Sequence, residues 1–293
     1  MTIIKARGLK KRFGKVQALK GIDLDIEKGT IHGFIGPNGA GKTTAIRILL
    51  GILKADDGQA SIYEKDVWED AVHIHERIAY VPGDVHLWDN LSGGEVIDIL
   101  AGLNNGYDKA RKEALIERFQ LDPTRKCRTY SKGNRQKVAL IAAFTKEADL
   151  YILDEPTIGL DPLMEREFET LIKEVAKAGK TVFLSSHILS EVEKLCDTVS
   201  IIKSGEIIES GTLQELRHLT RTTIRVETER PVTDLETLDG IHDLKQEGTR
   251  YTFQVDDEAM AKVMRHLSGF EIVSLKSAPP TLEDLFMRHY EAV

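Results

Sequence analysis

Between residues 36 and 44 the chain reads Gly36-Pro37-Asn38-Gly39-Ala40-Gly41-Lys42-Thr43-Thr44. The run before it, IHGFI at 31–35, is mostly apolar, as in a buried strand. The residues after it place Ala45, Ile48, Leu49 and Ile52 at helical spacing. A strand, a glycine-rich turn and a helix are therefore expected. In this context the pattern G-x-x-x-x-G-K-[ST] forms a phosphate-binding loop.

The residue types of this loop suit a nucleotide. Glycines allow the backbone to curl until several N–H groups point into one concavity, where the helix dipole adds positive potential. Lys42 would bridge the β- and γ-phosphates, Thr44 would hold a phosphate oxygen, and the Thr43 hydroxyl would be a ligand of Mg²⁺. A glycine-rich turn that merely starts a helix is the alternative, and the flanking strand and helix disfavour it.

An acidic pair follows a second apolar strand. Leu150 to Leu153 run directly into Asp154 and Glu155, which places both acids at the carboxyl end of the strand, where doubly wound sheets bind ligands. We expect Asp154 to hold Mg²⁺ through water and Glu155 to polarise the water that attacks the γ-phosphate. A solvated strand end would explain a lone Asp-Glu pair, but not a pair beside a phosphate loop.

The remaining pattern predicts an α/β protein in two parts. Runs at 2–6 and 22–26 indicate an antiparallel β region. Helical segments then alternate with apolar strands, which predicts a mostly parallel sheet covered by helices; the strands are best placed at 150–153, 181–185 and 199–202. Beyond a helical stretch at 213–219, strands are expected at 222–229, 251–256 and 270–275, and a helix at 281–290. We expect one domain over residues 1–215 and a small α+β domain over 216–293.

Composition bounds the class of protein. The chain has 293 residues, a formal net charge of -7 and no low-complexity tract, so general nucleic-acid binding is not expected. Cys127 and Cys196 lack the neighbours of a metal or redox motif and should be free thiols. No apolar run reaches the roughly 18 residues of a membrane span, and the amino terminus lacks the apolar core of a signal peptide. We therefore expect a cytoplasmic protein.

A polar segment ahead of the acidic strand carries a family resemblance. It reads Tyr130-Ser131-Lys132-Gly133-Asn134-Arg135-Gln136-Lys137 and resembles the signature sequence of ABC-type ATPases. The usual form is Leu-Ser-Gly-Gly-Gln; this segment departs from it at Tyr130, Lys132 and Asn134. The resemblance implies that Ser131, Gly133 and the downstream Gln136 belong to the ATP site, where the helix start closes over the γ-phosphate of ATP held by the opposite subunit. An ordinary helix start is the alternative.

Three further positions resemble the same family. Gly159-Leu160-Asp161 resembles the D-loop, which crosses the dimer interface and implies a place for Asp161 at the ATP site. His187, at the end of the run TVFLSS, resembles the switch histidine that contacts the γ-phosphate, with a structural histidine as the alternative. Phe13 lies where family members often place an aromatic ring that stacks on adenine; a core phenylalanine is the alternative.

Two segments need separate interpretation. The loop that normally carries a glutamine near the attacking water reads Tyr80-Val81-Pro82-Gly83-Asp84, so Gly83 takes the glutamine position and Asp84 is a candidate replacement. Leu91-Ser92-Gly93-Gly94-Glu95 is closer to the signature consensus, but it precedes a long helical segment far from the acidic strand. We interpret it as a turn and helix cap.

The resemblance covers about residues 1–215. It implies an α/β P-loop NTPase core of ABC type with an antiparallel β subdomain and a helical subdomain. It also implies an ATPase subunit of a transporter, with ATP and Mg²⁺ as cofactors. Such a subunit acts as a homodimer on the inner face of the cell membrane, beside a separately encoded membrane permease. The ending PPTLEDLF at 279–286 resembles the extension of bacterial exporter subunits and favours export.

Two other classes of protein are the alternatives to a transporter subunit. A soluble ABC-type ATPase acting on ribosomes or DNA would have two ATP-binding halves or long coiled-coil insertions, and this chain has one half and no sustained heptad run. A P-loop kinase or GTPase would not need the Ser131 segment or His187. The transported substrate is not predicted.

Overall fold

The computed structural model describes residues 1–103, 108–218, 221–278, 281 and 283. Contacts between Cα atoms divide the chain into two compact units, Met1–Gly211 and Thr212–Val293. The boundary expected from the sequence lies between residues 215 and 216. The helix expected over 281–290 lies outside the described residues, apart from positions 281 and 283.

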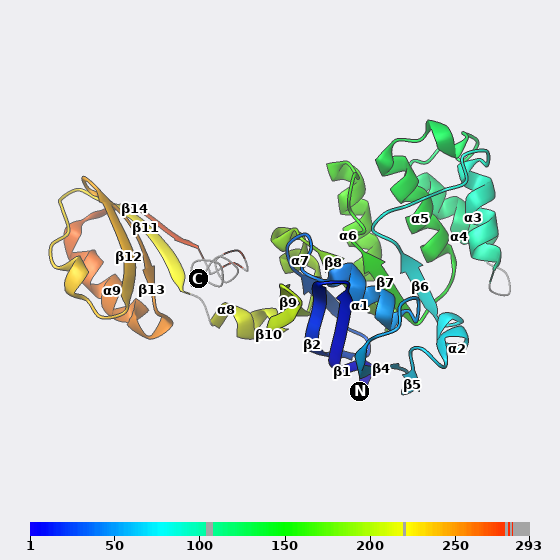
Figure 1. Ribbon diagram of the computed structural model, residues 1–293. Helices are drawn as coiled ribbons and strands as arrows, with labels where there is room; N and C mark the ends of the chain where they lie inside the picture. Colours follow the sequence, from blue (N-terminus) through cyan, green and yellow to red (C-terminus); the bar gives the residue numbers. More distant parts are fainter. Residues whose placement is uncertain (104–107, 219–220, 279–280, 282, 284–293) are drawn as a thin grey trace. The chain divides into compact units, whose positions relative to one another are not determined.

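A mostly parallel sheet forms the centre of the first unit (Figure 1). Within the described residues its strand order is β10-β9-β3-β8-β7-β6, and the pairs β9-β3, β3-β8, β8-β7 and β7-β6 are parallel. The strands are β3 (Ile31–Ile35), β6 (Ile78–Val81), β7 (Leu150–Asp154), β8 (Thr181–Ser186), β9 (Thr198–Lys203) and β10 (Glu206–Thr212). Every residue of β3, β7 and β8 is buried, as expected for strands covered on both faces. The predictions for β7, β8 and β9 are confirmed, whereas β6 was not predicted.

A second, antiparallel sheet comes from the start of the chain. Its order is β2-β1-β4-β5, and its strands are β1 (Thr2–Phe13), β2 (Val16–Glu27), β4 (Asp57–Ile62) and β5 (Lys65–Asp66). β1 and β2 form a hairpin in which Ala6 pairs with Leu24. This confirms the antiparallel region expected at the amino terminus.

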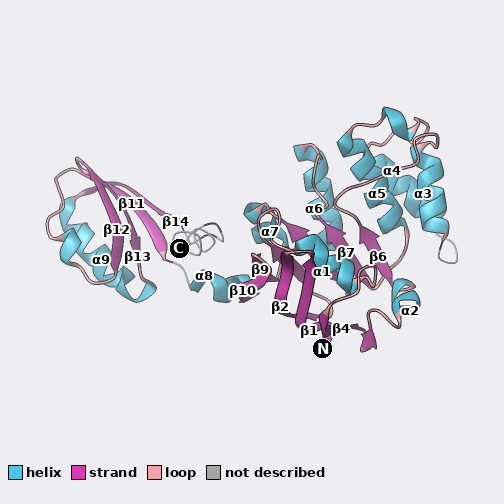
Figure 2. Cartoon of the chain, viewed as in Figure 1, coloured by secondary structure: helices cyan, strands magenta, loops and turns pink. Residues whose placement is uncertain are grey.

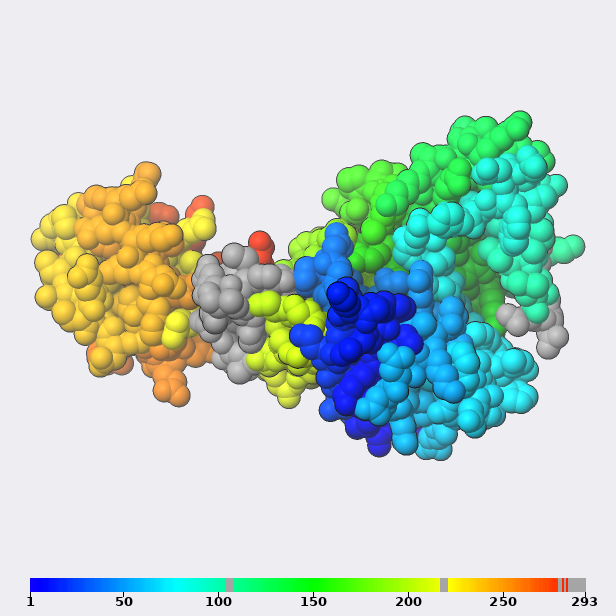
Figure 3. All heavy atoms as spheres, viewed as in Figure 1, coloured from blue at the N-terminus to red at the C-terminus, as the bar shows by residue number. Residues whose placement is uncertain are grey.

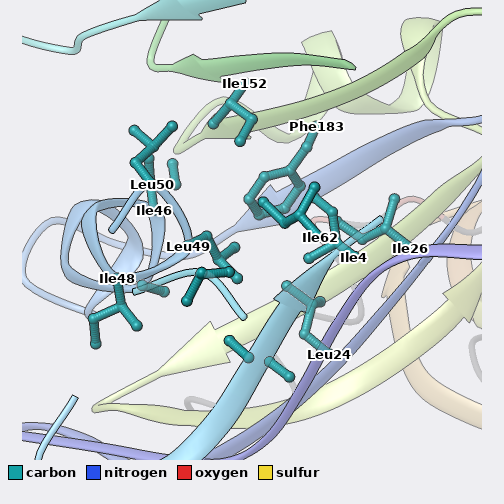
Figure 4. Close-up of a cluster of buried hydrophobic side chains, with 14 of the residues drawn as sticks. Ile4, Leu24, Ile26, Ile46, Ile48, Leu49, Leu50, Ile62, Ile152 and Phe183 are labelled. Carbon is teal, nitrogen blue, oxygen red and sulfur yellow. The ribbon is translucent and has the colours of Figure 1, made fainter. Parts of the chain in front are cut away.

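Helix α1 (Lys42–Leu49) is anchored by a hydrophobic core that joins the two sheets (Figure 4). Ile46, Ile48 and Leu49 of α1 pack in one cluster with side chains of both sheets. These partners include Ile4, Leu24, Ile26 and Ile62 of the antiparallel sheet and Ile152 and Phe183 of the parallel sheet. Burial of each such side chain stabilises the fold by about 1.5–3 kcal/mol. The second half of α1 is therefore held against both sheets.

The other helices of this unit have two locations. Helices α6 (Pro162–Lys177) and α7 (Leu189–Leu195) contact strands of the parallel sheet, α6 at β8 and α7 at both β3 and β8. Helices α3 (Gly93–Gly102) and α4 (Lys109–Arg118) both pack on α5 (Lys132–Thr145), and the three form a helical subdomain (Figures 1 and 3). Helix α5 is buried at every residue from Gln136 to Thr145. A short helix, α2 (Ala71–His75), precedes β6.

The second unit is a small α+β domain (Figure 2). After α8 (Leu213–His218) its antiparallel sheet has the order β12-β13-β11-β14. These strands are β11 (Thr222–Thr228), β12 (Ile241–Glu247), β13 (Arg250–Val255) and β14 (Ile272–Ala278). Helix α9 (Met260–Leu267) packs Val263 and Leu267 against the sheet in a separate core. None of the helices in the described part of either unit has the length and apolarity needed to cross a membrane.

Candidate functional site

The predicted phosphate loop joins β3 to α1. Gly36 has no room for a side chain, because a Cβ there would lie 2.3 Å from the carbonyl oxygen of Ile202. Gly41 precedes α1 with φ 112°, a left-handed conformation that favours glycine. Lys42 Nζ donates a hydrogen bond of 2.6 Å to the carbonyl oxygen of Gly36, so the lysine side chain folds back along the loop.

A cavity of about 330 Å³ lies in front of this loop. It brings together most of the predicted phosphate and metal residues with the acidic pair: Pro37, Asn38, Gly39, Gly41, Lys42, Thr43, Thr44, Asp154 and Glu155. Gly36 and Ala40 of the loop are buried and do not line the cavity. Ala18, Arg47, Tyr80, Pro82, Gly83, Asp84 and Ile158 complete the lining.

Asp154 lies at the end of β7 and is 1% exposed. Its two carboxylate oxygens accept hydrogen bonds from the Thr43 hydroxyl (2.8 Å) and the Ser185 hydroxyl (2.6 Å). A hydroxyl and a carboxylate at hydrogen-bonding distance on a cavity wall are oxygen donors of the kind Mg²⁺ takes from proteins. Thr43 and Asp154 therefore fit the predicted metal site.

Glu155 is held between two cationic or polar partners. Its Oε1 lies 3.0 Å from Lys42 Nζ, and a hydrogen bond of 2.6 Å joins its Oε2 to His187 Nδ1. The Glu155 backbone has φ 50°, a left-handed conformation that is unfavourable for glutamate. Its N–H donates to the carbonyl and hydroxyl oxygens of Ser185 at 3.2 and 3.1 Å, which secures this conformation. Strained residues held in this way gather at functional sites.

His187 was predicted from its place after the strand TVFLSS. Its side chain is 39% exposed and reaches Glu155, a residue of the neighbouring strand end. The structure therefore brings the predicted switch position together with the predicted catalytic carboxylate.

The residues of the signature segment lie at the start of α5, outside the cavity. Ser131 caps the helix by accepting a hydrogen bond of 3.3 Å from the N–H of Asn134. Gly133 approaches the loop after Glu155 so closely that a Cβ there would lie 2.2 Å from the carbonyl oxygen of Gly159. Asp161 caps α6 and lies 3.9 Å from Lys137 Nζ.

Gln136 occupies a different environment from Ser131. Its side chain is 1% exposed, and its amide donates a hydrogen bond of 3.0 Å to the carbonyl oxygen of Pro156. The amide is thus turned toward the segment that follows Glu155. This placement favours a structural task for Gln136 over the direct ATP contact expected from the sequence.

Phe13 ends β1 and is 50% exposed. The core-phenylalanine alternative is therefore wrong. Lys11 Nζ lies 5.8 Å from the centre of its ring, so the ring presents a face to a cation as well as to solvent. Phe13 does not line the cavity, although Ala18 of the paired strand β2 does.

The loop at residues 80–84, in which Gly83 takes the expected glutamine position, lies close to Asp154. A Cβ on Gly83 would lie 3.2 Å from the carbonyl oxygen of Asp154 and 3.3 Å from its carboxylate, which leaves little room for a glutamine side chain. Asp84 lines the cavity with a side chain that is 82% exposed, and its Oδ2 lies 3.8 Å from His86 Nδ1. Asp84 thus lines the same cavity as the acidic pair.

The predictions for the segment at residues 91–95 and for the two cysteines are confirmed. Ser92 and Glu95 form a capping box at the start of α3, with the Ser92 hydroxyl accepting from the Glu95 N–H and the Glu95 carboxylate accepting from the Ser92 N–H. Cys127 and Cys196 are free and buried, and burial raises the pKa of the Cys196 thiol.

Several residues of the site were not predicted from the sequence. Ser185 holds both Asp154 and Glu155, and Arg47 and Tyr80 line the cavity. Burial, followed by the nearby charge of Asp154, raises the pKa of Tyr80 to about 12. The two serines before His187 were the one available signal for Ser185, since a polar pair at the end of a buried strand needs partners.

The chain resembles known proteins over most of its length. The sequence profile described as ABC transporter matches residues 19–158, and the profile described as ATP-binding protein DrrA1-3-like, C-terminal domain, matches residues 211–290. The chain is 30% identical over 305 residues to the bacitracin transport ATP-binding protein BcrA of Bacillus licheniformis, covering 98% of this chain and 97% of that protein. It is 37% identical over 221 residues to the daunorubicin resistance ATP-binding protein DrrA3 of Streptomyces coeruleorubidus, covering 74% and 70%.

A third relative and two structures extend the comparison. The chain is 38% identical over 209 residues to an uncharacterized ABC transporter ATP-binding protein of a Nostoc strain, and it spans 62% of that relative's length. A solved ATP binding subunit of an ABC transporter has 30% identity and a TM-score of 0.68, covering 74% of this chain and 92% of that one. A dimeric bacterial ABC transporter cassette, at 23% identity, TM-score 0.66 and coverage of 72% and 98%, shows the shared fold.

Proposed function

Because the chain belongs to the family of ABC transporter ATP-binding subunits, we propose that it binds and hydrolyses ATP to power export through a separate membrane permease. One observation carries this proposal: the phosphate loop and the acidic pair meet at a single cavity, where Lys42 lies 3.0 Å from Glu155 and Thr43 bonds to Asp154. Phosphoryl transfer needs mainly positioning and electrostatic stabilisation, and these residue types supply both.

Each residue of the cavity has a proposed role. The backbone from Gly36 to Gly41 cradles the phosphates at the start of α1, and Lys42 places its charge against the β- and γ-phosphates. Thr44 binds a phosphate oxygen. Glu155 orients and polarises the attacking water, and His187, hydrogen-bonded to Glu155, contacts the γ-phosphate. Phe13 stacks on the adenine.

The metal has a matching pair of ligands. Thr43 and Asp154 would hold Mg²⁺, Asp154 through water, and the ion would neutralise charge on the phosphate oxygens. Ser185 keeps the Asp154 carboxylate turned toward Thr43 by binding its other oxygen.

A second copy of the chain completes the site. Ser131 and Gly133 lie outside the cavity of their own chain, at the start of a helix that can bind an anion. We infer that they close over ATP held by the partner in a homodimer, with Asp161 at the interface. Residues 1–215 would then be the nucleotide-binding domain and 216–293 an accessory domain.

The names of the relatives support two parts of the proposal: that transport is outward, and that the chain acts on the cytoplasmic face of the cell membrane. BcrA and DrrA3 are named for bacitracin transport and daunorubicin resistance, and resistance is consistent with outward transport. The match of residues 211–290 to the DrrA-like C-terminal domain extends the likeness to the second unit. We expect a permease with apolar spans of about 20 residues each.

Co-expression tests the proposal directly. The chain should sediment with membranes when a candidate permease is present and stay in the soluble fraction without it, and the membranes should hydrolyse ATP. Lys42→Ala is the matched control, because it should still reach the membrane but fail to hydrolyse ATP. Copurification with ribosomes or DNA, together with an ATPase rate that no permease alters, would show a soluble ABC-type ATPase instead.

A further inference from the structure

A carboxylate outside the cavity lining joins the two segments that carry the proposed hydrolytic pair. Glu191 lies in the first turn of α7 and is half-buried. Its Oε2 accepts hydrogen bonds from the Thr157 hydroxyl at 3.1 Å and from the Ser186 hydroxyl at 3.0 Å. Burial is the main cause that raises the pKa of the Glu191 carboxyl, and the two hydroxyls oppose it.

Both hydroxyls belong to residues next to the proposed hydrolytic pair. Thr157 follows Glu155 by two positions, and Ser186 immediately precedes His187. The two segments leave neighbouring parallel strands, because Asp154 of β7 pairs with Ser185 of β8. Beyond these paired residues the Glu155 N–H still donates to the carbonyl oxygen of Ser185, and further contacts between the segments are made by side chains: His187 with Glu155, and Glu191 with Thr157 and Ser186.

Resting on the proposed function, we propose that Glu191 is a positioning residue for ATP hydrolysis: its carboxylate ties the Thr157 segment to the Ser186 segment and so keeps His187 in hydrogen-bonding register with Glu155. Glu191 does not line the cavity. It therefore acts on the arrangement of the hydrolytic groups and leaves the binding of the nucleotide unchanged.

The size of the effect follows from the geometry. The hydrogen bond from His187 Nδ1 to Glu155 Oε2 is 2.6 Å long, so a small relative shift of the two segments breaks it. A misplacement of about 1 Å at a reacting centre costs on the order of 10²-fold in rate. An apolar side chain at position 191 would also remove the acceptor of the buried Thr157 hydroxyl and leave the Ser186 hydroxyl only the long 3.5 Å contact with the Ile188 carbonyl oxygen, which favours rearrangement of both segments.

The first test compares three substitutions in the complete protein. Glu191→Leu should lower kcat by roughly 10- to 100-fold while the Kd for MgATP stays unchanged. Glu191→Gln should recover most of the lost rate, because its amide oxygen accepts the same two hydroxyls. Thr157→Val removes one of the two links and should have an intermediate effect on kcat. Thr157→Ser keeps the hydroxyl and should restore the rate. An unchanged kcat in Glu191→Leu, or equal defects in Glu191→Gln and Glu191→Leu, would overturn the proposal.

The second test separates positioning from a general role in folding. His187→Ala should lower kcat strongly in the wild-type background, and adding Glu191→Leu to it should cause little further loss, because the contact that Glu191 protects is already absent. Penalties that multiply would show that Glu191 acts independently of His187. If Glu191→Leu does not fold, as judged by thermal unfolding, Thr157→Val and His187→Ala provide the same cycle.

The wild-type protein and Glu155→Gln distinguish this inference from the proposed function. If neither differs from a blank in ATP hydrolysis, the proposed function fails. If the wild type hydrolyses ATP and Glu155→Gln does not, while Glu191→Leu and Thr157→Val retain full activity, only the positioning role is wrong.

Discussion

Lys42 and Glu155 form an ion pair in which Nζ lies 3.0 Å from Oε1, with side chains that are 6% and 12% exposed. Charges this poorly solvated depend on their partners, because removal of one leaves the other uncompensated. The residue proposed to hold the phosphates is thus directly joined to the residue proposed to polarise the attacking water. Substitution of Lys42 and substitution of Glu155 should therefore have different effects on ATP binding and hydrolysis.

Glu155→Gln should retain ATP binding and stop turnover. The amide keeps the shape of the carboxylate and releases Lys42 from its ion pair, but it cannot accept a proton from water. We expect kcat to fall by about 10²–10⁴-fold, with nucleotide affinity equal to or higher than that of the wild type. Parallel measurements of ATPase rate and equilibrium ATP binding check this, with Lys42→Ala as the variant that loses binding. Normal hydrolysis by Glu155→Gln would remove Glu155 from its proposed role.

Asp84→Ala should lower the ATPase rate by roughly tenfold, less than the loss of a primary general base. The Asp84 carboxylate lines the cavity beside Gly83, where a glutamine side chain would crowd Asp154. His86→Ala is the control, since it removes the neighbour 3.8 Å from Asp84 and leaves the carboxylate in place. If Asp84→Ala matches the wild type in both ATPase and transport rates, Asp84 does not replace the missing glutamine.

The local parts of the site could be predicted from the sequence because they depend on neighbours along the chain. The apolar run 31–35, the glycines and Lys42 specify a strand, a turn and a helix start within 12 residues of one another. Asp154 and Glu155 were likewise placed by the buried strand that precedes them. β6, only four residues long, gave too short a pattern to recognise.

The contacts across strands could not be predicted in this way. Ser185 meets Asp154 because β7 and β8 pair in one particular register, and Glu191 reaches Thr157 because α7 packs against β8. The orientation of Gln136 could not be predicted from its motif either. The motif resembles an ATP-binding signature, but the packing of α5 turns the Gln136 side chain toward Pro156. A motif specifies which residues are near a site, and tertiary packing decides which way each one points.

Acidification should destabilise the first unit through His32. This histidine is buried in β3 between the hydroxyls of Thr198 and Ser200, and burial lowers its pKa from 6.5 to about 4. Because the unfolded chain binds the proton more tightly, stability is lost as the pH falls from 6.5 toward 4. The loss between pH 7 and pH 5 is about 2 kcal/mol. Thermal unfolding at both pH values should show this drop in the wild type and a smaller one in His32→Gln; equal drops would exclude His32 as the cause.

The sharpest prediction concerns two inactive variants that restore each other. Ser131 and Gly133 lie outside the cavity of their own chain, so each ATP pocket should belong to two chains. Lys42→Ala destroys the phosphate loop, and Ser131→Arg places a bulky side chain where the γ-phosphate should dock, so each homodimer has two damaged pockets. Neither should hydrolyse ATP appreciably.

In a mixed dimer, the Ser131→Arg chain contributes an intact phosphate loop that faces the intact signature of the Lys42→Ala chain. Both defects then fall in the other pocket, and one pocket is whole. Mixing the two inactive proteins should therefore recover ATPase activity or a dimer stabilised by ATP, measured with the permease present if the isolated subunit is too slow. Mixing each variant with itself is the control. If crosslinking shows that mixed dimers form, yet neither hydrolysis nor ATP-dependent closure returns, Ser131 does not act on the ATP of its partner.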